Sequence, residues 1–254
     1  MNNPLLEACV GSYASAQAAW KGGADRLEVC ANLIIGGTTP SREMVEQILR
    51  DVPTKANILI RPRFGDFLYD SMETEEMCRQ IVAFRELGVN GVVIGALTCE
   101  GDLDLERMKR MMDCAGDVEV TLHRAFDMTR DPFQALEDAI SLGCKTILTS
   151  GQQQTAQAGA RLLEKLQKQA AGRITLMAGS GVKSGNIQAL HAATGITAFH
   201  ASGKQTLDSG MRYRKDTVSM GLPSLSEYDI WLTDEEEIRR CADMVHSLGD
   251  GGRA

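Results

Sequence analysis

Short apolar runs alternate with longer amphipathic stretches along the whole chain. The runs predict eight strands, over residues 5–10, 26–30, 57–63, 91–97, 119–126, 146–150, 174–178 and 198–202. Between them, apolar residues at i, i+3 and i+4 predict helices over residues 42–50, 73–87, 105–115, 132–142, 156–170 and 186–193. Successive strands begin roughly 21 to 34 residues apart, which is typical of repeated strand–helix units in a parallel sheet.

Glycines mark this repeat at four places. Gly23, Gly88, Gly143 and Gly195 each follow a helical stretch and precede the next strand by three or four residues. Glycine just after a helix readily takes the left-handed conformation that ends it. Eight strand–helix units close naturally into an α/β fold, the (β/α)8 TIM barrel, which we predict as a single domain. A doubly wound open sheet is the alternative, although such sheets usually stop at five or six parallel strands.

The same glycines predict which side chains meet at one end of the barrel. Positions five and seven residues after each glycine share one face of their strands, because side chains alternate along a strand. The later set lies nearer the carboxyl ends of the strands, where barrel proteins place their sites, and its members are small: Cys30, Gly95, Ser150 and Ser202. We therefore expect a pocket at this end.

The C-terminal part departs from the repeat. The predicted barrel spans residues 1–248 and includes a long segment after the eighth strand, residues 203–232; loops of this length are usually functional or disordered. The last helix is predicted to begin at Thr233, whose hydroxyl caps it, with Glu236 completing a capping box. Residues 249–254 are expected to form a mobile tail.

Charge and composition exclude several classes of protein. The 254 residues include 27 basic and 34 acidic side chains, with no Lys/Arg run longer than two, so no nucleic-acid partner is expected. The first residues lack the regions of a signal peptide, and no apolar run approaches the roughly 20 residues that span a bilayer. Seven cysteines occur without a CxxC pair. These features favour a cytoplasmic protein with reduced thiols and no membrane partner.

The first two strands each place a glutamate two residues before a cysteine. Glu7 precedes Cys9 and Glu28 precedes Cys30, so pairing of the strands would gather two carboxylates and two thiols. A glutamate inside an apolar strand is costly unless it is paired or used, which makes Glu7 and Glu28 candidates for acid–base catalysis. The alternatives are a structural ion pair with an arginine, and cysteines that act only as small buried hydrophobes.

Charged residues also follow the third strand. Arg61 and Arg63 are predicted to share a strand face, and Asp66 follows them as a further substrate-binding candidate. Two arginines aimed into a barrel mouth can balance Glu7 and Glu28, or bind a carboxylate or phosphate. The alternative is that both are surface arginines in a loop.

Histidines occur at the ends of two other strands. His123 lies in the fifth strand beside Arg124, and His200 lies in the eighth. A lone histidine at a strand end is more often structural. Two histidines, two glutamates and two arginines on one rim form a denser polar set than a scaffold needs. We therefore take His123 and His200 as catalytic candidates and Arg124 as a substrate-binding candidate.

Glycine-rich turns follow the seventh and eighth strands. Gly179, Ser180 and Gly181 precede a helix, and Ser202 ends the eighth strand. Many barrels bind phosphate in this region, so these four residues are expected to contact an anionic substrate. The alternative is that the tight turns simply require glycine.

Soft donor atoms allow a metal site as well. Thiols and thioethers suit Cu(I), and Cys9, Cys30 and Met177 supply them from three strands, with His200 as an assisting ligand. The spacing of these residues matches no known metal motif, so the fold itself would have to assemble the site.

A series of motifs resembles the CutC family, the copper homeostasis proteins. The resemblance runs from residue 5 to about residue 220 and rests on LEAC (6–9), GADRLEVC (23–30), GGTTPS (36–41), RPRFGDF (61–67), HRAFD (123–127), LTSG (148–151), MAGSGV (177–182), HAS (200–202) and MRYR (211–214). It implies a cytoplasmic (β/α)8 barrel, often oligomeric and here expected as a homodimer, that is linked to copper tolerance. It also implies that Cys30 matches a family cysteine considered for copper, and that the glutamates, arginines and histidines line the barrel mouth.

Two functions therefore remain open, with a metal ion or a small anion as the partner. The first is a protein of copper homeostasis that binds Cu(I), which the resemblance favours. The second is a barrel enzyme of lyase or isomerase type that acts on a small anionic, sugar-like substrate, which the rim of Glu, Arg and His favours.

Overall fold

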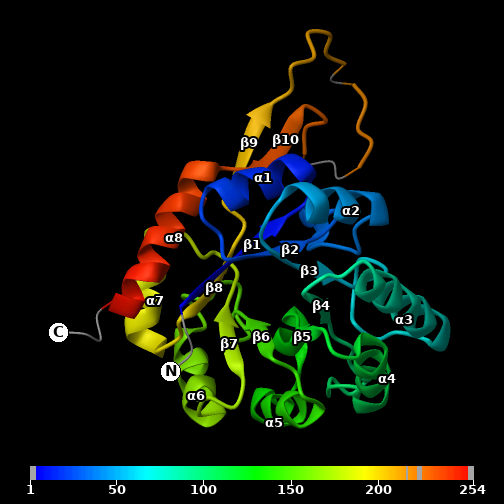
Figure 1. Ribbon diagram of the computed structural model, residues 1–254, viewed down its shortest axis with the longest axis vertical. Helices are drawn as coiled ribbons and strands as arrows, with labels where there is room; N and C mark the ends of the chain where they lie inside the picture. The colour runs from blue at the N-terminus through cyan, green and yellow to red at the C-terminus, as the bar shows by residue number, and fades with distance from the viewer. Residues whose placement is uncertain (1–3, 216, 222–224, 251–254) are drawn as a thin grey trace.

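Eight parallel strands pair in chain order and close on themselves (Figure 1). The computed structural model describes residues 4–215, 217–221 and 225–250. The barrel strands are β1 (Leu5–Val10), β2 (Arg26–Val29), β3 (Lys55–Leu59), β4 (Gly91–Ile94), β5 (Glu119–Leu122), β6 (Thr146–Thr149), β7 (Thr175–Ala178) and β8 (Ala198–Ala201). Because β1 pairs with both β2 and β8, the predicted (β/α)8 barrel is confirmed.

Helices follow the strands and surround the barrel. They are α1 (Tyr13–Lys21), α2 (Arg42–Asp51), α3 (Ser71–Glu86), α4 (Leu105–Ala115), α5 (Pro132–Leu142), α6 (Ala160–Ala170), α7 (Ile187–Thr194) and α8 (Glu235–Asp250), with the short 3-10 helices η1 (Leu33–Ile35) and η2 (Arg124–Met128). The apolar periodicity does not predict α1, because four of the nine residues in its sequence YASAQAAWK are alanine and its faces show little contrast.

Several barrel strands end earlier than the apolar runs predict. β3 ends at Leu59 rather than at residue 63, and η2 replaces the end of the predicted strand 119–126. The η2 turn forms because Nδ1 of His123 accepts a hydrogen bond from the backbone N–H of Ala125 at 3.1 Å. The residues beyond each strand thus belong to loops at the barrel mouth, where strand alternation no longer decides which way a side chain points.

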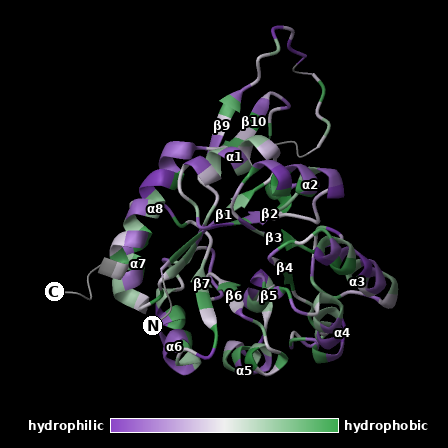
Figure 2. Ribbon diagram, in the orientation of Figure 1, coloured by the Kyte–Doolittle hydropathy of each residue, from purple (hydrophilic) through white to green (hydrophobic). Residues whose placement is uncertain are grey.

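The barrel has apolar side chains on both faces of its strands. The main core lies between strands and helices, and the helices carry both hydrophobic and hydrophilic positions (Figure 2). Two smaller clusters come from the alternate strand positions, which face the barrel interior: Cys9, Cys30, Leu59 and Val93 in one, Leu148, Met177 and Ala198 in the other. The polar side chains described below share this interior with them.

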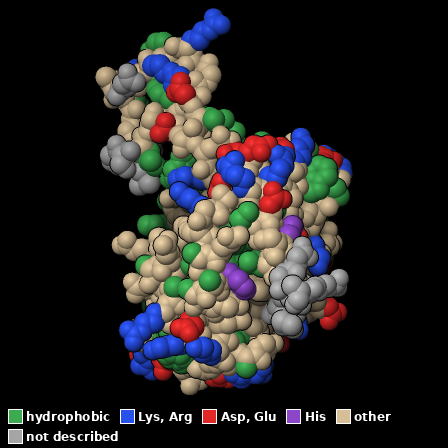
Figure 3. Space-filling model, turned by 90° about the vertical axis from the view of Figure 1, so that its left-hand side faces the viewer, with side chains coloured by type: hydrophobic (Ala, Val, Ile, Leu, Met, Phe, Trp, Pro, Cys, Tyr) green, Lys and Arg blue, Asp and Glu red, His purple; other side chains and the backbone are tan. Residues whose placement is uncertain are grey.

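The segment after β8 begins and ends as a hairpin. β9 (Lys204–Asp208) pairs antiparallel with β10 (Asp229–Thr233). The connection between them is the arm, whose described residues 209–215, 217–221 and 225–228 stand out from the body (Figure 3). Neither strand is predicted by the sequence pattern. The predicted long segment, residues 203–232, thus contains most of a two-stranded ribbon, which ends at Thr233.

The predicted start of the last helix is wrong. Thr233 ends β10, and its hydroxyl donates to the carbonyl of Ser202 at 3.3 Å instead of capping the helix. The carboxylate of Asp234 accepts the backbone N–H of Glu236 at 2.9 Å, and the side chain of Glu236 pairs with Arg239. Of the expected mobile tail, residues 249–250 lie in α8, and residues 251–254 lie outside the described residues.

None of the described helices combines the length and the apolar character needed to cross a membrane.

Candidate functional site

A cavity of about 1200 Å³ opens at the carboxyl ends of the barrel strands. Its wall includes side chains from β1, β2 and β8, from the loops after β3, β5 and β7, and from the β9–β10 hairpin. The residues used below are Cys9, Glu28, Arg61, His123, Ser180 and His200. This is the end of the barrel at which the sequence predicts a pocket.

Two thiols and a carboxylate meet at the base of the cavity, where Cys9 and Glu28 line its wall and Cys30 lies behind them. The strand register places Cys9 beside Glu28, and the sulfur of Cys9 lies 3.2 Å from Oε2 of Glu28. The sulfur of Cys30 lies 3.3 Å from the same oxygen and 3.6 Å from the sulfur of Cys9. All three side chains are buried. The barrel therefore assembles the group that the two strand motifs predict.

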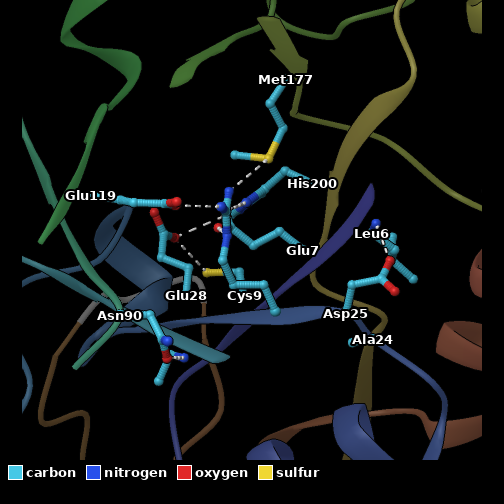
Figure 4. A network of polar contacts seen from close by, with 12 residues as sticks. Leu6, Glu7, Cys9, Ala24, Asp25, Glu28, Asn90, Glu119, Met177 and His200 are labelled. Carbon is cyan, nitrogen blue, oxygen red and sulfur yellow. Dashed lines mark hydrogen bonds and ion pairs between the residues drawn. The ribbon is translucent and has the colours of Figure 1, made fainter. Parts of the chain in front are cut away.

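His200 lies between the two glutamates (Figure 4). Its Nδ1 lies 2.9 Å from Oε1 of Glu7, and its Nε2 lies 3.7 Å from Oε2 of Glu28. The contact arises because β8 pairs with β1 in a register that puts His200 opposite Glu7. A continuous polar chain therefore runs from Glu7 through His200 and Glu28 to the thiols.

The members of this chain shift one another's pKa values. The hydrogen bond from Cys30 is the main reason that the pKa of Cys9 falls to about 5, against the effect of burial and with help from His200. Burial and its neighbour Cys9 raise the pKa of Cys30 well above its usual range. Burial likewise raises the pKa of Glu28, and the charge of Cys9 adds to it. One thiol of the pair thus ionises readily, while the other thiol and the carboxyl group resist ionisation.

The pKa values of His200 and Glu7 move in opposite directions. Burial opposes ionisation of both groups. For His200, the neighbouring Glu28, Cys9 and Glu7 outweigh burial and raise the pKa well above 6.5. For Glu7, Arg26 and His200 outweigh burial and lower the pKa. The site therefore favours an imidazolium next to a carboxylate at this position.

Arg26 is the partner of Glu7 that the sequence analysis missed. Its Nε lies 2.6 Å from Oε2 of Glu7, and its Nη1 lies 3.7 Å from Glu119 at the start of β5. The expectation that Arg61 and Arg63 balance the glutamates is wrong. The missed signal was in β2, where Arg26 stands two residues before Glu28 on the same strand face.

Arg61 and Arg63 separate because β3 ends before both. Arg61 is buried in the cavity wall and donates to the carbonyls of Ile35, Gly37 and Gly65. Arg63 turns away and pairs with Asp66 and Glu73. Arg63 and Asp66 do not line the cavity, so the structure does not bring these two substrate-binding candidates to the site.

His123 and Arg124 both reach the cavity but play different structural roles. His123 is 4% exposed, and its ring packs 4.9 Å from that of Phe67. Arg124 is paired with Asp127 at 2.7 Å and donates to the hydroxyl of Ser150 at 2.9 Å. His123 is therefore a buried wall residue, and Arg124 is a partly exposed cation at the rim.

The turn after β7 contributes two of its three candidates to the cavity wall. Ser180 and Gly181 line it, with φ angles of +73° and +72°, and Ser202 lines it from the end of β8. Gly179 does not line it; an added Cβ there would lie 2.5 Å from the side chain of Leu148. Gly179 thus serves packing, which agrees with the tight-turn alternative.

Met177 lies apart from the thiols. Its side chain is in the interior cluster with Leu148 and Ala198, and its sulfur lies 3.9 Å from Nη2 of Arg26. The two groups of potential metal ligands among the described residues are Cys9, Glu28 and Cys30, and Glu7, Glu28 and His200. Met177 contacts a guanidinium rather than the thiol pair, so the structure does not place it as a third sulfur ligand.

Fold and site together define a (β/α)8-barrel protein with buried thiol, carboxylate and imidazole groups at the carboxyl ends of its strands. The sequence model of the CutC family matches residues 4–205. The chain belongs to the CutC family.

Individual relatives agree with this assignment over most of the chain. A relative from Chromobacterium violaceum, named family protein CutC, is 46% identical over 235 residues, which are 92% of this chain and 95% of the relative. The human copper homeostasis protein cutC homolog is 43% identical over 239 residues, 94% of this chain and 88% of the relative. The crystal structure of CutC from Streptococcus agalactiae superposes with a TM-score of 0.75 at 28% identity and covers 78% of this chain and 98% of that one.

Proposed function

We propose that this chain binds Cu(I) through Cys9 and Cys30 and takes part in copper homeostasis in the cytoplasm. The observation that carries the proposal is the thiol pair, whose sulfurs lie 3.6 Å apart and of which Cys9 lines the cavity. The name of the human relative, copper homeostasis protein cutC homolog, supports the general role.

The donor set fits a soft monovalent cation as the cargo. Thiolate sulfur is the ligand type that Cu(I) prefers. The pKa of about 5 at Cys9 makes one thiolate available at neutral pH, because the hydrogen bond from Cys30 stabilises it. Donor atoms of Cys9, Glu28 and Cys30 lie within 4.8 Å of one another. Cys9 and Cys30 would hold the ion, and the carboxyl group of Glu28 would lie beside it as the nearest oxygen donor.

Competition with a chromogenic Cu(I) chelator, without oxygen and with reductant, tests this proposal. The intact chain is expected to take up one Cu(I) per molecule, and Cys30→Ser and Cys9→Ser are each expected to lose this uptake. Cys144→Ser is the matched control, because Cys144 is also buried but packs in the core outside the barrel.

Met177→Leu distinguishes a site formed by the two thiols from a site that also includes the Met177 sulfur, as the sequence suggests. Its sulfur faces Arg26, so the variant is expected to bind Cu(I) with unchanged affinity. Undiminished Cu(I) uptake by Cys30→Ser would exclude the assigned site.

A second candidate function is supported by the position of His200. It lies between Glu7 and Glu28 beside an open cavity, which is an arrangement suited to proton transfer on a bound substrate. This candidate is an enzyme of lyase or isomerase type acting on a small anionic, sugar-like substrate. Arg124, Ser180, Gly181 and Ser202 would contact the anion.

Thermal unfolding in the presence of sugar phosphates and small carboxylates, with and without Cu(I), separates the two candidates. Stabilisation by an anion in the copper-free protein is expected if the cavity binds a substrate. If Cu(I) stabilises the protein and no anion does so at millimolar concentration, only the first candidate function remains.

A further inference from the structure

A buried arginine in the cavity wall has no acidic partner. Arg61 is 7% exposed, and no carboxylate of the described residues forms an ion pair with it. Its terminal nitrogens donate to three backbone carbonyls, and its Nε has no hydrogen-bond partner among the described residues. A buried cation without a counter-ion is costly, so this wall of the cavity favours an anion.

The neighbouring histidine is fixed as a hydrogen-bond donor. Nδ1 of His123 accepts the backbone N–H of Ala125, so in the neutral ring the proton is on Nε2. Burial and the nearby charge of Arg61 lower the pKa of His123 to about 3, which keeps the ring neutral. Its Nε2 is buried, and no described residue accepts its hydrogen bond. A buried N–H without a partner calls for a water molecule or a ligand oxygen.

His123 faces the acid–base residues across the barrel, whereas Arg61 follows β3, the neighbour of β2. In the closed eight-stranded barrel, β5 lies four strands from β1 in either direction. His123 follows β5, whereas Cys9 and Glu28 lie on β1 and β2. All of these residues line one cavity, so a small molecule in it can contact both walls.

We propose that the cavity binds a small carboxylate with an oxygen on the adjacent carbon, a 2-oxo or 2-hydroxy acid. Arg61 attracts the carboxylate, and Nε2–H of His123 donates to the adjacent oxygen. The inference deepens the second candidate function, on which it rests, by naming the class of substrate and the group that recognises it. A neutral imidazole in this role can also stabilise negative charge that develops on a carbonyl oxygen.

Calorimetric titration of the copper-free protein with pyruvate and with propionate tests the inference, because the two acids differ only in the oxygen on the adjacent carbon. Pyruvate is expected to bind roughly tenfold or more tightly than propionate, the difference that one hydrogen bond to a buried donor makes. His123→Gln keeps a donor near the Nε2 position and should keep this preference. His123→Phe keeps an aromatic ring without a donor and should lose it. Both variants lose the Nδ1 acceptor, so each controls for that loss in the other.

Nitrogen NMR of the intact protein with labelled histidine provides a readout that needs no variant. His123 is expected to show the neutral tautomer protonated on Nε2, and this signal should move with pyruvate and not with propionate. A ring protonated on Nδ1, or equal binding of the two acids, would overturn the inference and leave anion binding intact. Binding of neither acid at millimolar concentration would overturn the inference, and the second candidate function would fall with it only if sugar phosphates also fail to stabilise the protein.

Discussion

The charged side chains buried inside the barrel stabilise one another. Glu7 is fully buried and is held by Arg26 on one side and His200 on the other. Removing one member of a buried ion pair leaves the other uncompensated, which costs more than the pair itself contributes. Each charged side chain in this site therefore stabilises the charged form of its neighbour.

Arg26→Met tests this dependence. The variant is expected to lose about 3–5 kcal/mol in free energy of unfolding, because Glu7 loses its closest cation in a buried position. Urea unfolding at pH 7 measures the loss. The double variant Arg26→Met with Glu7→Gln should recover much of it. Arg42→Met, which breaks an exposed pair with Glu46, should cost less than about 1 kcal/mol. A cost as small for Arg26→Met would contradict the buried pair.

His123 makes stability depend on pH in a defined direction. Its pKa is lowered from 6.5 to about 3 in the fold by burial, with Arg61 contributing. Below pH 6.5 the unfolded chain binds a proton that the folded chain does not, so the fold loses stability as pH falls toward 3. His123→Gln removes this contribution. As the pH falls from 7 to 4.5, the free energy of unfolding of the variant is expected to rise by about 2–3 kcal/mol relative to that of the intact chain. Parallel pH curves for the two proteins, measured by denaturant unfolding, would contradict the assignment.

At the scale of elements, one carboxylate joins two loops at the barrel mouth. Asp127 in η2 accepts from the hydroxyl of Thr149 at 2.6 Å and from the backbone N–H groups of Ser150 at 3.0 Å and Gln152 at 3.1 Å. It also holds Arg124 at 2.7 Å. The loops after β5 and β6 are thus ordered by a contact that neither loop provides alone.

Asp127→Asn is expected to destabilise the chain by about 2–3 kcal/mol, because an amide N–H₂ would replace an oxygen that faces donors. Asp131→Asn is the matched control. Asp131 caps α5 through the N–H groups of Phe133 and Gln134, and asparagine caps a helix about as well as aspartate. Thermal unfolding of the two variants side by side measures the difference. Equal stability of both would show that Asp127 does not order these loops.

At the scale of the whole molecule, the arm makes its hydrogen bonds apart from the barrel, although its Leu225 and Ser226 line the cavity. Hydrogen bonds of the described arm residues stay within the hairpin: Arg214 binds Asp208, the N–H of Lys215 donates to Tyr228, and the N–H of Met220 donates to Glu227. Met211, Tyr213 and Met220 in the arm are exposed. The homodimer expected from the family resemblance stays a prediction, which sedimentation of the intact chain measures.

Replacing residues 210–227 by Asn-Gly tests the independence of the barrel. Ser209 and Tyr228 are already joined, since the N–H of Ser209 donates to the carbonyl of Tyr228 at 2.8 Å. An Asn-Gly turn suits such a hairpin end. The free energy of unfolding is expected to change by less than about 1 kcal/mol, and the uptake of one Cu(I) should persist. Loss of folding in this variant would mean that the arm belongs to the folding unit.

The sequence by itself determined the barrel and the residue types at its mouth. Each strand–helix unit is local, so its apolar period and the glycine that ends its helix are readable without the rest of the chain. The pairing of charges was decided only in the tertiary structure. Register sets Cys9 beside Glu28 and Glu7 opposite Arg26, and the end of β3 at Leu59 turns Arg63 away from the cavity. Such contacts join residues far apart in the chain, and the partner of a buried charge depends on which strands become neighbours and in which register.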